Sequence, residues 1–378
     1  MAKDKNDLIK YPTPTKVVVK VGTRLLTHNS GKLNLGYMEK LARSLADIRN
    51  KGHEVILVTS GSIGAGRGKL NILRRSISIP EKQAIAAVGQ GLLIQIYEKL
   101  FAEYGLVVGQ ILLTRTDLIS RRRYINICNT VSMLLKFGVI PIINENDSVS
   151  TEEIKFGDND RLSAMVAGLS DAGMLIVLTD VDGLFDANPR KYPEAKLIPV
   201  VEKIDHNIRA GAEKSDDDLA TGGMITKLQA AEIAAMSGVP MYICNGTDPS
   251  VVSRIIEGER VGTYFCPQEH YLNRRKRWIA YGQIVRGSVT VDRGACQALC
   301  DGNKSLLPVG VTAVSGQFEQ GDLIAVLDSE GKELGRGLSN FSAAELAKIC
   351  RKDSREVAEI IDRPFAEEVI HKDDLIVY

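Results

Sequence analysis

Short apolar runs alternate with longer segments of helical periodicity up to about residue 260. The runs Lys16–Val21 (KVVVKV), Glu54–Thr59 (EVILVT) and Met174–Leu178 (MLIVL) are rich in β-branched and aliphatic residues, which predicts strands. These runs are continuously apolar rather than alternating, as expected for strands that are buried on both faces of a mostly parallel sheet. Three further strands are predicted at Val107–Leu113, Val139–Ile143 and Pro240–Cys244.

The segments between these strands have the spacing of amphipathic helices. Leu41, Leu45 and Ile48 recur at helical intervals and predict a helix over Gly36–Asn50. Strands that alternate with helices predict an α/β fold, an open, mostly parallel sheet sandwiched by helices. The other predicted helices are Glu81–Tyr104, a stretch between Leu113 and Val139, one that starts near Asp160, and Gly223–Ser237 with Gly238 as its C-cap.

The pattern changes beyond residue 260. Short β-like runs separated by turn residues, with one helical segment, predict a separate, small β-rich domain. We therefore expect an N-terminal extension at 1–15 without an assigned role, an α/β domain at 16–268, a linker at 269–284 and a β-rich domain at 285–378. The β-like runs are Ser288–Val291, Ile324–Leu327 and Asp374–Val377, and the helical segment is Ser342–Arg351.

Composition narrows the class of protein. The 378 residues are 44% hydrophobic and 25% charged, which is ordinary for a folded globular chain. Lys and Arg number 48 against 47 Asp and Glu, so net charge gives no sign of a nucleic-acid or membrane partner. The six cysteines include no C-x-x-C pair, and the charged start MAKDKNDLIK lacks the apolar core of a secretory signal. We expect a cytoplasmic protein without a membrane span.

Ligands of open α/β sheets lie at the carboxyl ends of the strands, so the residues that follow each strand are the candidates for chemistry. Lys20 stands inside an apolar strand, where a buried ammonium group needs an anionic partner. The alternatives are a solvated sheet edge or a structural salt bridge.

Two glycine-rich segments are further candidates: one follows a predicted strand and the other begins a predicted helix. Ser60 through Gly66 follows the second strand, and its glycines allow backbone N–H groups to approach an anion, although a plain turn would have the same composition. Neither a Walker A loop nor G-x-G-x-x-G fits this segment. The segment Thr221–Lys227 opens a helix and offers glycines, hydroxyls and a lysine to a polyphosphate. The alternative is a capped helix with an exposed lysine.

Two acidic, amide-rich segments complete the set. Asn144–Asp147 and Gly157–Asp160 suit a cationic substrate group, or a metal with its phosphates, but Asn and Asp are also favoured in turns and helix caps. Thr179-Asp180 follows another strand. Together, lysines, anion-binding glycines and carboxylates at strand ends indicate phosphoryl transfer by positioning and charge neutralisation.

Several motifs resemble the glutamate 5-kinase branch of the amino acid kinase family. They are VVVKVGTRLLT, VTSGSIGAGR, AAVGQ, LLTRTD, PIINENDSVS, IKFGDNDRLSA, LTDVDGLF and TGGMITKLQAA. The tail, from RKRW through SLLPVGVTAVSGQFEQGD, resembles a PUA domain. The resemblance implies the reaction ATP + L-glutamate → L-glutamyl 5-phosphate + ADP with Mg²⁺, the first step of proline synthesis from glutamate.

The resemblance also implies roles for individual residues. Lys20 and Lys227 would neutralise the transferred γ-phosphoryl group, and Asp158 would help to hold these lysines. No metal ligand is assigned to a protein side chain. Glutamate would be bound by Ser60, Asp147 and Asn159, with Asn144 and Asp160 close by. ATP would be held by Lys20, Thr179, Asp180, Thr221, Gly222, Gly223, Met224, Ile225, Thr226 and Lys227, above a floor of glycines between Gly61 and Gly66.

Partners follow from the same resemblance. It implies L-proline as feedback inhibitor, a homo-oligomer (dimer or tetramer) and RNA as a ligand of the PUA-like domain. The alternative is an RNA-binding or regulatory protein that keeps a degenerate kinase fold, which the basic segment Arg274–Arg277 would favour. The presence of Lys20, Asp158 and Lys227 argues against a decayed site.

Overall fold

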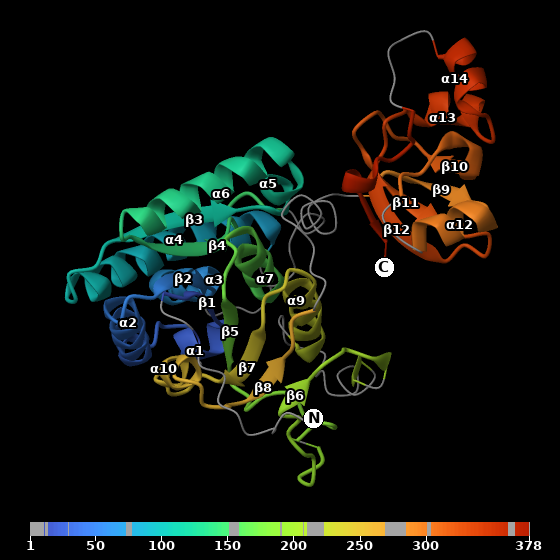
Figure 1. The fold of residues 1–378 in the computed structure, drawn as a ribbon. Helices are drawn as coiled ribbons and strands as arrows, with labels where there is room; N and C mark the ends of the chain where they lie inside the picture. The colour runs from blue at the N-terminus through green and yellow to red at the C-terminus, as the bar shows by residue number, and fades with distance from the viewer. Residues whose placement is uncertain are drawn as a thin grey trace. The chain divides into compact units, whose positions relative to one another are not determined.

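The computed structural model describes residues 11, 14–28, 30–72, 78–150, 159–189, 191–206, 208–209, 223–268, 285–300, 304–361 and 367–377. The chain divides into two compact units (Figure 1). The first consists of Met1–Asp117 with Ile125–Tyr271, and the second of Leu118–Tyr124 with Leu272–Tyr378.

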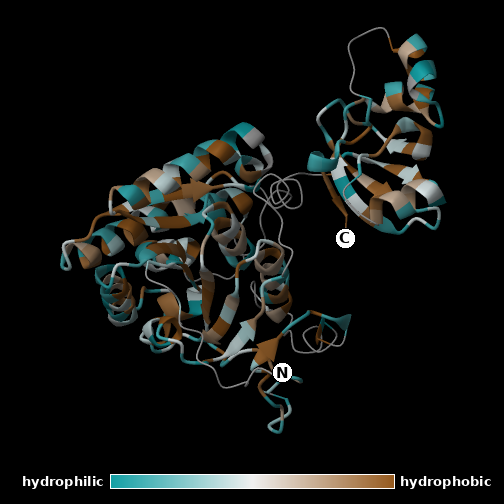
Figure 2. Cartoon of the chain, in the orientation of Figure 1, coloured by the Kyte–Doolittle hydropathy of each residue, from teal (hydrophilic) through white to brown (hydrophobic). Residues whose placement is uncertain are grey.

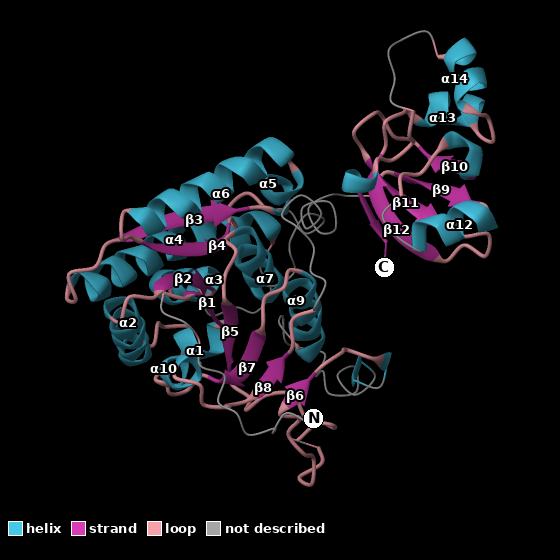
Figure 3. Cartoon of the chain, in the orientation of Figure 1, coloured by secondary structure: helices cyan, strands magenta, loops and turns pink. Residues whose placement is uncertain are grey.

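The first unit is built on an eight-stranded sheet in the order β3-β4-β2-β1-β5-β7-β8-β6 (Figures 1 and 3). From β3 to β7 every neighbouring pair is parallel, so these strands present their carboxyl ends at one edge of the sheet. Beyond β7 the sheet continues with β8, which runs antiparallel to β7. The bounds are β1 Lys16–Val21, β2 Glu54–Thr59, β3 Val108–Leu113, β4 Ile140–Glu145, β5 Met174–Thr179, β6 Val200–Val201, β7 Met241–Asn245 and β8 Thr263–Phe265.

Helices cover both faces of this sheet. Val17, Val19 and Val21 of β1 belong to the core that packs against α2, α4 and α10. Because side chains alternate along a strand, Lys20 points to the other face, where α7 packs over the central strands and beside α9. Much of the sheet is accordingly apolar (Figure 2). The helices are α1 Thr23–Leu26, α2 Leu35–Asn50, α3 Ser62–Leu70, α4 Ile79–Ala102, α5 Arg115–Ile119, α6 Arg121–Lys136, α7 Asn159–Leu169, α9 Met224–Met236 and α10 Val251–Ile256.

The fold class expected from the sequence is confirmed, with local differences; helices α1 and α10, for example, were not predicted. Most of the expected glycine-rich loop after β2 is helix α3, in which Gly66 packs closely against α4 and Gly64 lies against Thr27. Asn144 and Glu145 end β4 instead of following it, and both are buried there. Strands β6 and β8 were not predicted, because two and three residues are too few to show a period. Gly238, with φ +71°, follows α9 as predicted.

The second unit contains a five-stranded sheet in the order β10-β9-β11-β12-β13, with its own apolar core. The sequence predicted β9, β11, β13 and α13, but not β10, β12, α12 or α14. Glycines lower the strand propensity of β12, yet a Cβ at Gly335 would lie 2.0 Å from the carbonyl oxygen of Ile376. The elements are β9 Gly287–Val291, α12 Arg293–Cys300, β10 Val311–Gly316, β11 Leu323–Leu327, β12 Glu333–Leu338, α13 Ala343–Ile349, α14 Ser354–Ile360 and β13 Leu375–Val377.

Several predicted features fall outside the described residues. They are Asp158, Thr221, Gly222, the expected linker at 269–284 and most of the expected extension at 1–15. Within the described ranges, no helix combines the length and the apolar character that crossing a membrane requires.

Candidate active site

A buried carboxylate lies between two buried lysines at the carboxyl ends of the central strands. The Nζ atom of Lys20 lies 2.5 Å from Oδ1 of Asp160, and the Nζ atom of Lys227 lies 3.1 Å from Oδ2. Asp160 is fully buried, and the two lysines are 4% and 6% exposed. We call these three residues the Lys–Asp–Lys cluster.

The fold explains why these residues meet. Lys20 lies on a central strand between β2 and β5, on the face that α7 covers, so a solvated sheet edge is excluded. Asp160 is in the first turn of α7, and Lys227 is near the start of α9. Two helix N-termini with their partial positive charge therefore converge on this edge of the sheet.

The charges of the cluster define what it can bind. The three side chains supply two ammonium groups and one carboxylate, and removing such charges from water costs several kcal/mol per ion. Two ammonium groups that meet at one point suit an anionic ligand. Asp160 makes the contacts that the sequence analysis assigned to Asp158, which lies outside the described residues.

An amide network joins this cluster to the next strand. The Nδ2 atom of Asn159 donates to the Thr59 carbonyl oxygen at 3.0 Å, to Ser60 Oγ at 2.9 Å and to Asn144 Oδ1 at 2.9 Å. Asn144 Nδ2 in turn donates to Gln90 Oε1 at 2.8 Å. The ends of β2 and β4, the start of α7 and the middle of α4 are therefore tied together beside the cluster.

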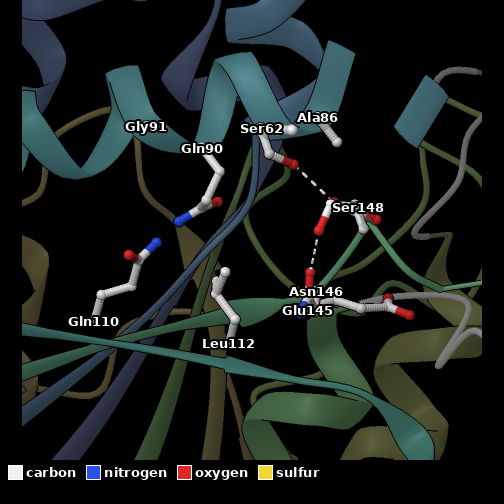
Figure 4. Close-up of a pocket in the computed structure, with 11 residues that line it drawn as sticks. Ser62, Ala86, Gln90, Gly91, Gln110, Leu112, Glu145, Asn146 and Ser148 are labelled. Atoms are coloured by element: carbon white, nitrogen blue, oxygen red, sulfur yellow. Dashed lines mark hydrogen bonds between the residues drawn. The ribbon is translucent and has the colours of Figure 1, made fainter. Parts of the chain in front are cut away.

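A cavity of about 270 Å³ lies beside this network, and Asp147 is one of the residues that line it. Ser62 Oγ donates to Asp147 Oδ2 at 2.7 Å. Figure 4 shows Ser62 and Gln90 on one side, with Gln110 and Leu112 of β3 across from them. Two carboxylates, Glu145 and Asp147, line this Asp147 pocket, whose described lining includes no Lys or Arg, so a cationic group fits it.

The end of β5 carries a different ion pair. Arg24 Nη1 donates to Asp180 Oδ2 at 2.8 Å, and Thr179 Oγ1 donates to Asp180 Oδ1 at 3.3 Å. Partial burial opposes ionisation, but the hydrogen bond and charge of Arg24 hold the pKa of the Asp180 carboxyl below its ordinary value. Asp180 is therefore an ionised carboxylate near neutral pH.

The described residues that the sequence predicted for the site thus gather at one sheet edge. Lys20 and Lys227 meet at Asp160; Ser60, Asn144 and Asn159 form the amide network; Asp147 lies in the adjoining pocket. Thr179 and Asp180 end β5 or follow it, while Gly223 caps α9 and Met224, Ile225 and Thr226 form its first turn.

Sequence reasoning missed Ser62, Gln90 and Arg24. The motif AAVGQ contains Gln90, and that match was the available signal for its place in the site. Ser62 lies in the segment that was interpreted as a loop, so its hydroxyl could not be given a direction.

The chain belongs to the amino acid kinase family, whose model matches residues 15–245. The model of the PUA domain matches residues 287–361. Among curated relatives, the glutamate 5-kinase of Caldanaerobacter subterraneus subsp. tengcongensis is 52% identical over 362 residues, or 96% of this chain and 97% of that protein. The glutamate 5-kinase of Moorella thermoacetica is 49% identical and covers 96% of both chains. Among solved structures, the UMP kinase of Bacillus anthracis is 18% identical over 67% of this chain and 96% of its own, with a TM-score of 0.46.

Proposed function

We propose that this protein is a glutamate 5-kinase. It transfers the γ-phosphoryl group of ATP to the side-chain carboxylate of L-glutamate, giving L-glutamyl 5-phosphate and ADP, as the first step of proline synthesis. The observation that carries the proposal is the pair of buried lysines that share Asp160 at the carboxyl edge of the sheet. Relatives of about 50% identity over nearly the whole chain support the same activity.

The chemistry needs what this cluster offers. An oxygen of the glutamate carboxylate attacks the γ-phosphorus, and the bond from that phosphorus to the β,γ-bridging oxygen breaks. The carboxylate is already ionised at neutral pH, so no general base is required. The two anionic groups repel each other as they approach. Lys20 and Lys227 lower this repulsion by neutralising the transferred phosphoryl group. Asp160 keeps both ammonium groups aimed at the same point, and Asp158 stays a prediction for a supporting role.

The amide network and the Asp147 pocket fit the rest of the glutamate molecule. Glutamate would lie along Ser60, Asn144 and Asn159, with its α-ammonium group at Asp147 and its side-chain carboxylate toward Asp160 and the lysines. The support is the continuous chain of hydrogen bonds from Asn159 through Asn144, and the acidic lining of the Asp147 pocket.

ATP would lie over the start of α9 and the end of β5. We propose Thr179, Asp180 and Thr221–Lys227 as its contacts, together with Lys20. Mg²⁺ fits this arrangement as a companion of the nucleotide, because it usually takes only one or two carboxylates besides phosphate oxygens and water. Asp180 follows β5 and is partly exposed, so it is a described carboxylate that could take part, and Mg²⁺ would supply further neutralisation of phosphate charge.

Product formation tests the proposal directly. ADP release by the purified full-length chain is measured with L-glutamate, L-aspartate and N-acetyl-L-glutamate, and the acyl phosphate is trapped with hydroxylamine. Glutamate-dependent ADP release with hydroxamate formation is expected, and both should be far weaker with the other two acids. ADP release that is independent of glutamate would overturn the proposal.

Further proposals concern organisation and regulation. We propose the domain boundaries 1–15, 16–268, 269–284 and 285–378, a cytoplasmic location, a homo-oligomer of two or four chains, and inhibition by L-proline. The PUA domain supports RNA as a possible ligand of the second unit. Filter binding with structured RNA, beside the ADP assay, separates this addition from the alternative of an RNA-binding protein without kinase activity.

A further inference from the structure

Helices α3 and α4 cross so closely that their backbones touch. A Cβ atom at Gly66 would lie 1.9 Å from the carbonyl oxygen of Ile85, and one at Gly89 would lie 1.8 Å from the carbonyl oxygen of Ser62. Real Cβ atoms essentially never approach within 3.0 Å of such atoms. Only glycine at both positions therefore permits this crossing.

The residues beside this contact carry polar groups of the candidate site. Ser62, the first residue of α3, is 3% exposed and donates its hydroxyl to Asp147 Oδ2 at 2.7 Å. Gln90 follows Gly89 and accepts a hydrogen bond from Asn144. The backbone contact thus fixes how far the start of α3 lies from the segment after β4.

We propose that Ser62 is a positioning residue for substrate binding, held in place by the crossing of Gly66 and Gly89. The inference deepens the proposed function and rests on Asp147 as the group that binds the α-ammonium of glutamate. A carboxylate has roughly four lone-pair positions, and the Ser62 hydroxyl takes one of them and so sets the rotation of the Asp147 carboxylate. Because the donor is neutral, the pocket keeps the negative charge of Glu145 and Asp147 that selects a cationic group.

Ser62→Ala tests this role with little change in volume. Hydrogen bonds to charged groups are strong, so the KM for glutamate should rise about 10- to 100-fold. The kcat and the KM for ATP should change little, since the contact is the same in the ground and transition states. Ser44→Ala is the matched control. Ser44 lies in α2, is also buried, and donates its hydroxyl to the Pro249 carbonyl oxygen.

Gly89→Ala tests the crossing itself. The added methyl group forces α3 away from α4, so the KM for glutamate should rise at least as much as in Ser62→Ala, with a lower melting temperature. Gly36→Ala in α2 is its control, since a Cβ there meets only Asn34 Oδ1 at 3.9 Å. If Gly89→Ala does not fold, Ser62→Ala decides alone.

The outcomes separate the two levels of inference. If the wild-type chain does not phosphorylate glutamate, the proposed function and this inference both fall. If the wild type is active but Ser62→Ala keeps the wild-type KM for glutamate, only the positioning role of Ser62 is overturned. Equal changes of melting temperature in Ser62→Ala and Ser44→Ala, with a KM shift in Ser62→Ala alone, support the inference.

Discussion

The Lys–Asp–Lys cluster and the Asp147 pocket hold their charged groups in different ways. The cluster places three buried, charged side chains from β1, α7 and α9 against one another, with two ammonium groups on one carboxylate. In the pocket, the Asp147 carboxylate accepts a hydrogen bond from the neutral hydroxyl group of Ser62 in α3. The close contact between the backbones of α3 and α4 sets the position of that hydroxyl group.

This contrast separates two tasks of a kinase. Buried ionic contacts are strong only when every partner is present, so the cluster is sensitive to any loss of charge. A neutral hydrogen bond orients a carboxylate without cancelling it, so the pocket remains able to bind a cation. Substitutions in the cluster should therefore change turnover and stability, whereas substitutions in the pocket should change the use of one substrate.

The largest effect is expected for Asp160→Ala. It leaves two ammonium groups buried without their shared carboxylate, which should lower the free energy of unfolding by about 3–5 kcal/mol. Turnover should fall by at least about 1000-fold, because both lysines lose their orientation. Urea unfolding and kcat are measured together. A variant as stable as the wild type would show that the carboxylate does not hold the lysines.

Lys227→Ala should lower kcat by about 100- to 1000-fold, since one donor to the transferred phosphoryl group is removed. The fold should survive, because Asp160 keeps Lys20 as its partner. Lys51→Ala is the control, as Lys51 forms an exposed pair with Glu257 at 2.6 Å. Near-normal turnover of Lys227→Ala would exclude the phosphoryl-neutralising role.

Asp147→Ala should raise the KM for glutamate about 30-fold or more, the loss expected when one partner of a buried charge pair is truncated. The KM for ATP should stay constant. This selective effect on one substrate would distinguish a substitution in the Asp147 pocket from one in the Lys–Asp–Lys cluster. If Asp147 only closes a turn, the melting temperature will fall and both KM values will drift modestly.

Arg24→Ala should have a small, pH-dependent effect. Despite the opposing effect of burial, Arg24 holds the pKa of Asp180 below its ordinary value of 3.8, so the pair stabilises the fold above that pH and loses this contribution as the pH falls below it. Both side chains are partly exposed, so the loss at neutral pH should be less than about 1 kcal/mol. Urea unfolding should show a difference in the free energy of unfolding between the wild type and Arg24→Ala at neutral pH, but no difference well below pH 3.8. An equal difference at both would contradict the pairing.

The smallest effect is expected from removing the second unit. Residues 1–273 contain both regions of the candidate site and a complete sheet with its own core, so kcat and both KM values should match those of the full chain. An insoluble or inactive fragment would show that the expected domain boundary is wrong.

The sequence predicted the parallel sheet because its strands are continuously apolar and buried on both faces. It also placed Lys20, Ser60, Asn144 and Asp147 at the correct edge, since strand ends follow directly from strand positions. It could not distinguish a glycine that opens a loop from one that admits a neighbouring helix. Gly66 is of the second kind, and its partner Gly89 lies on a different helix.

Partners within the site were harder to predict than its location. Asp160 lies in an acidic segment with several Asn and Asp residues, and composition does not tell that its carboxylate contacts both lysines. The direction of a side chain depends on where α7 begins, and helix starts are uncertain by a residue or two. The sequence does not show how α3 lies relative to the segment after β4. The hydrogen bond from Ser62 to Asp147 therefore could not be predicted.

During synthesis, Lys20 leaves the ribosome first, and Lys227 follows Asp160 by 67 residues. Translation proceeds at about 5–20 residues per second, so for several seconds the nascent chain carries Lys20 and Asp160 without Lys227. The second ammonium group arrives only when α9 docks beside α7. The phosphate binding that we propose for both lysines would therefore arise late in the synthesis of the chain.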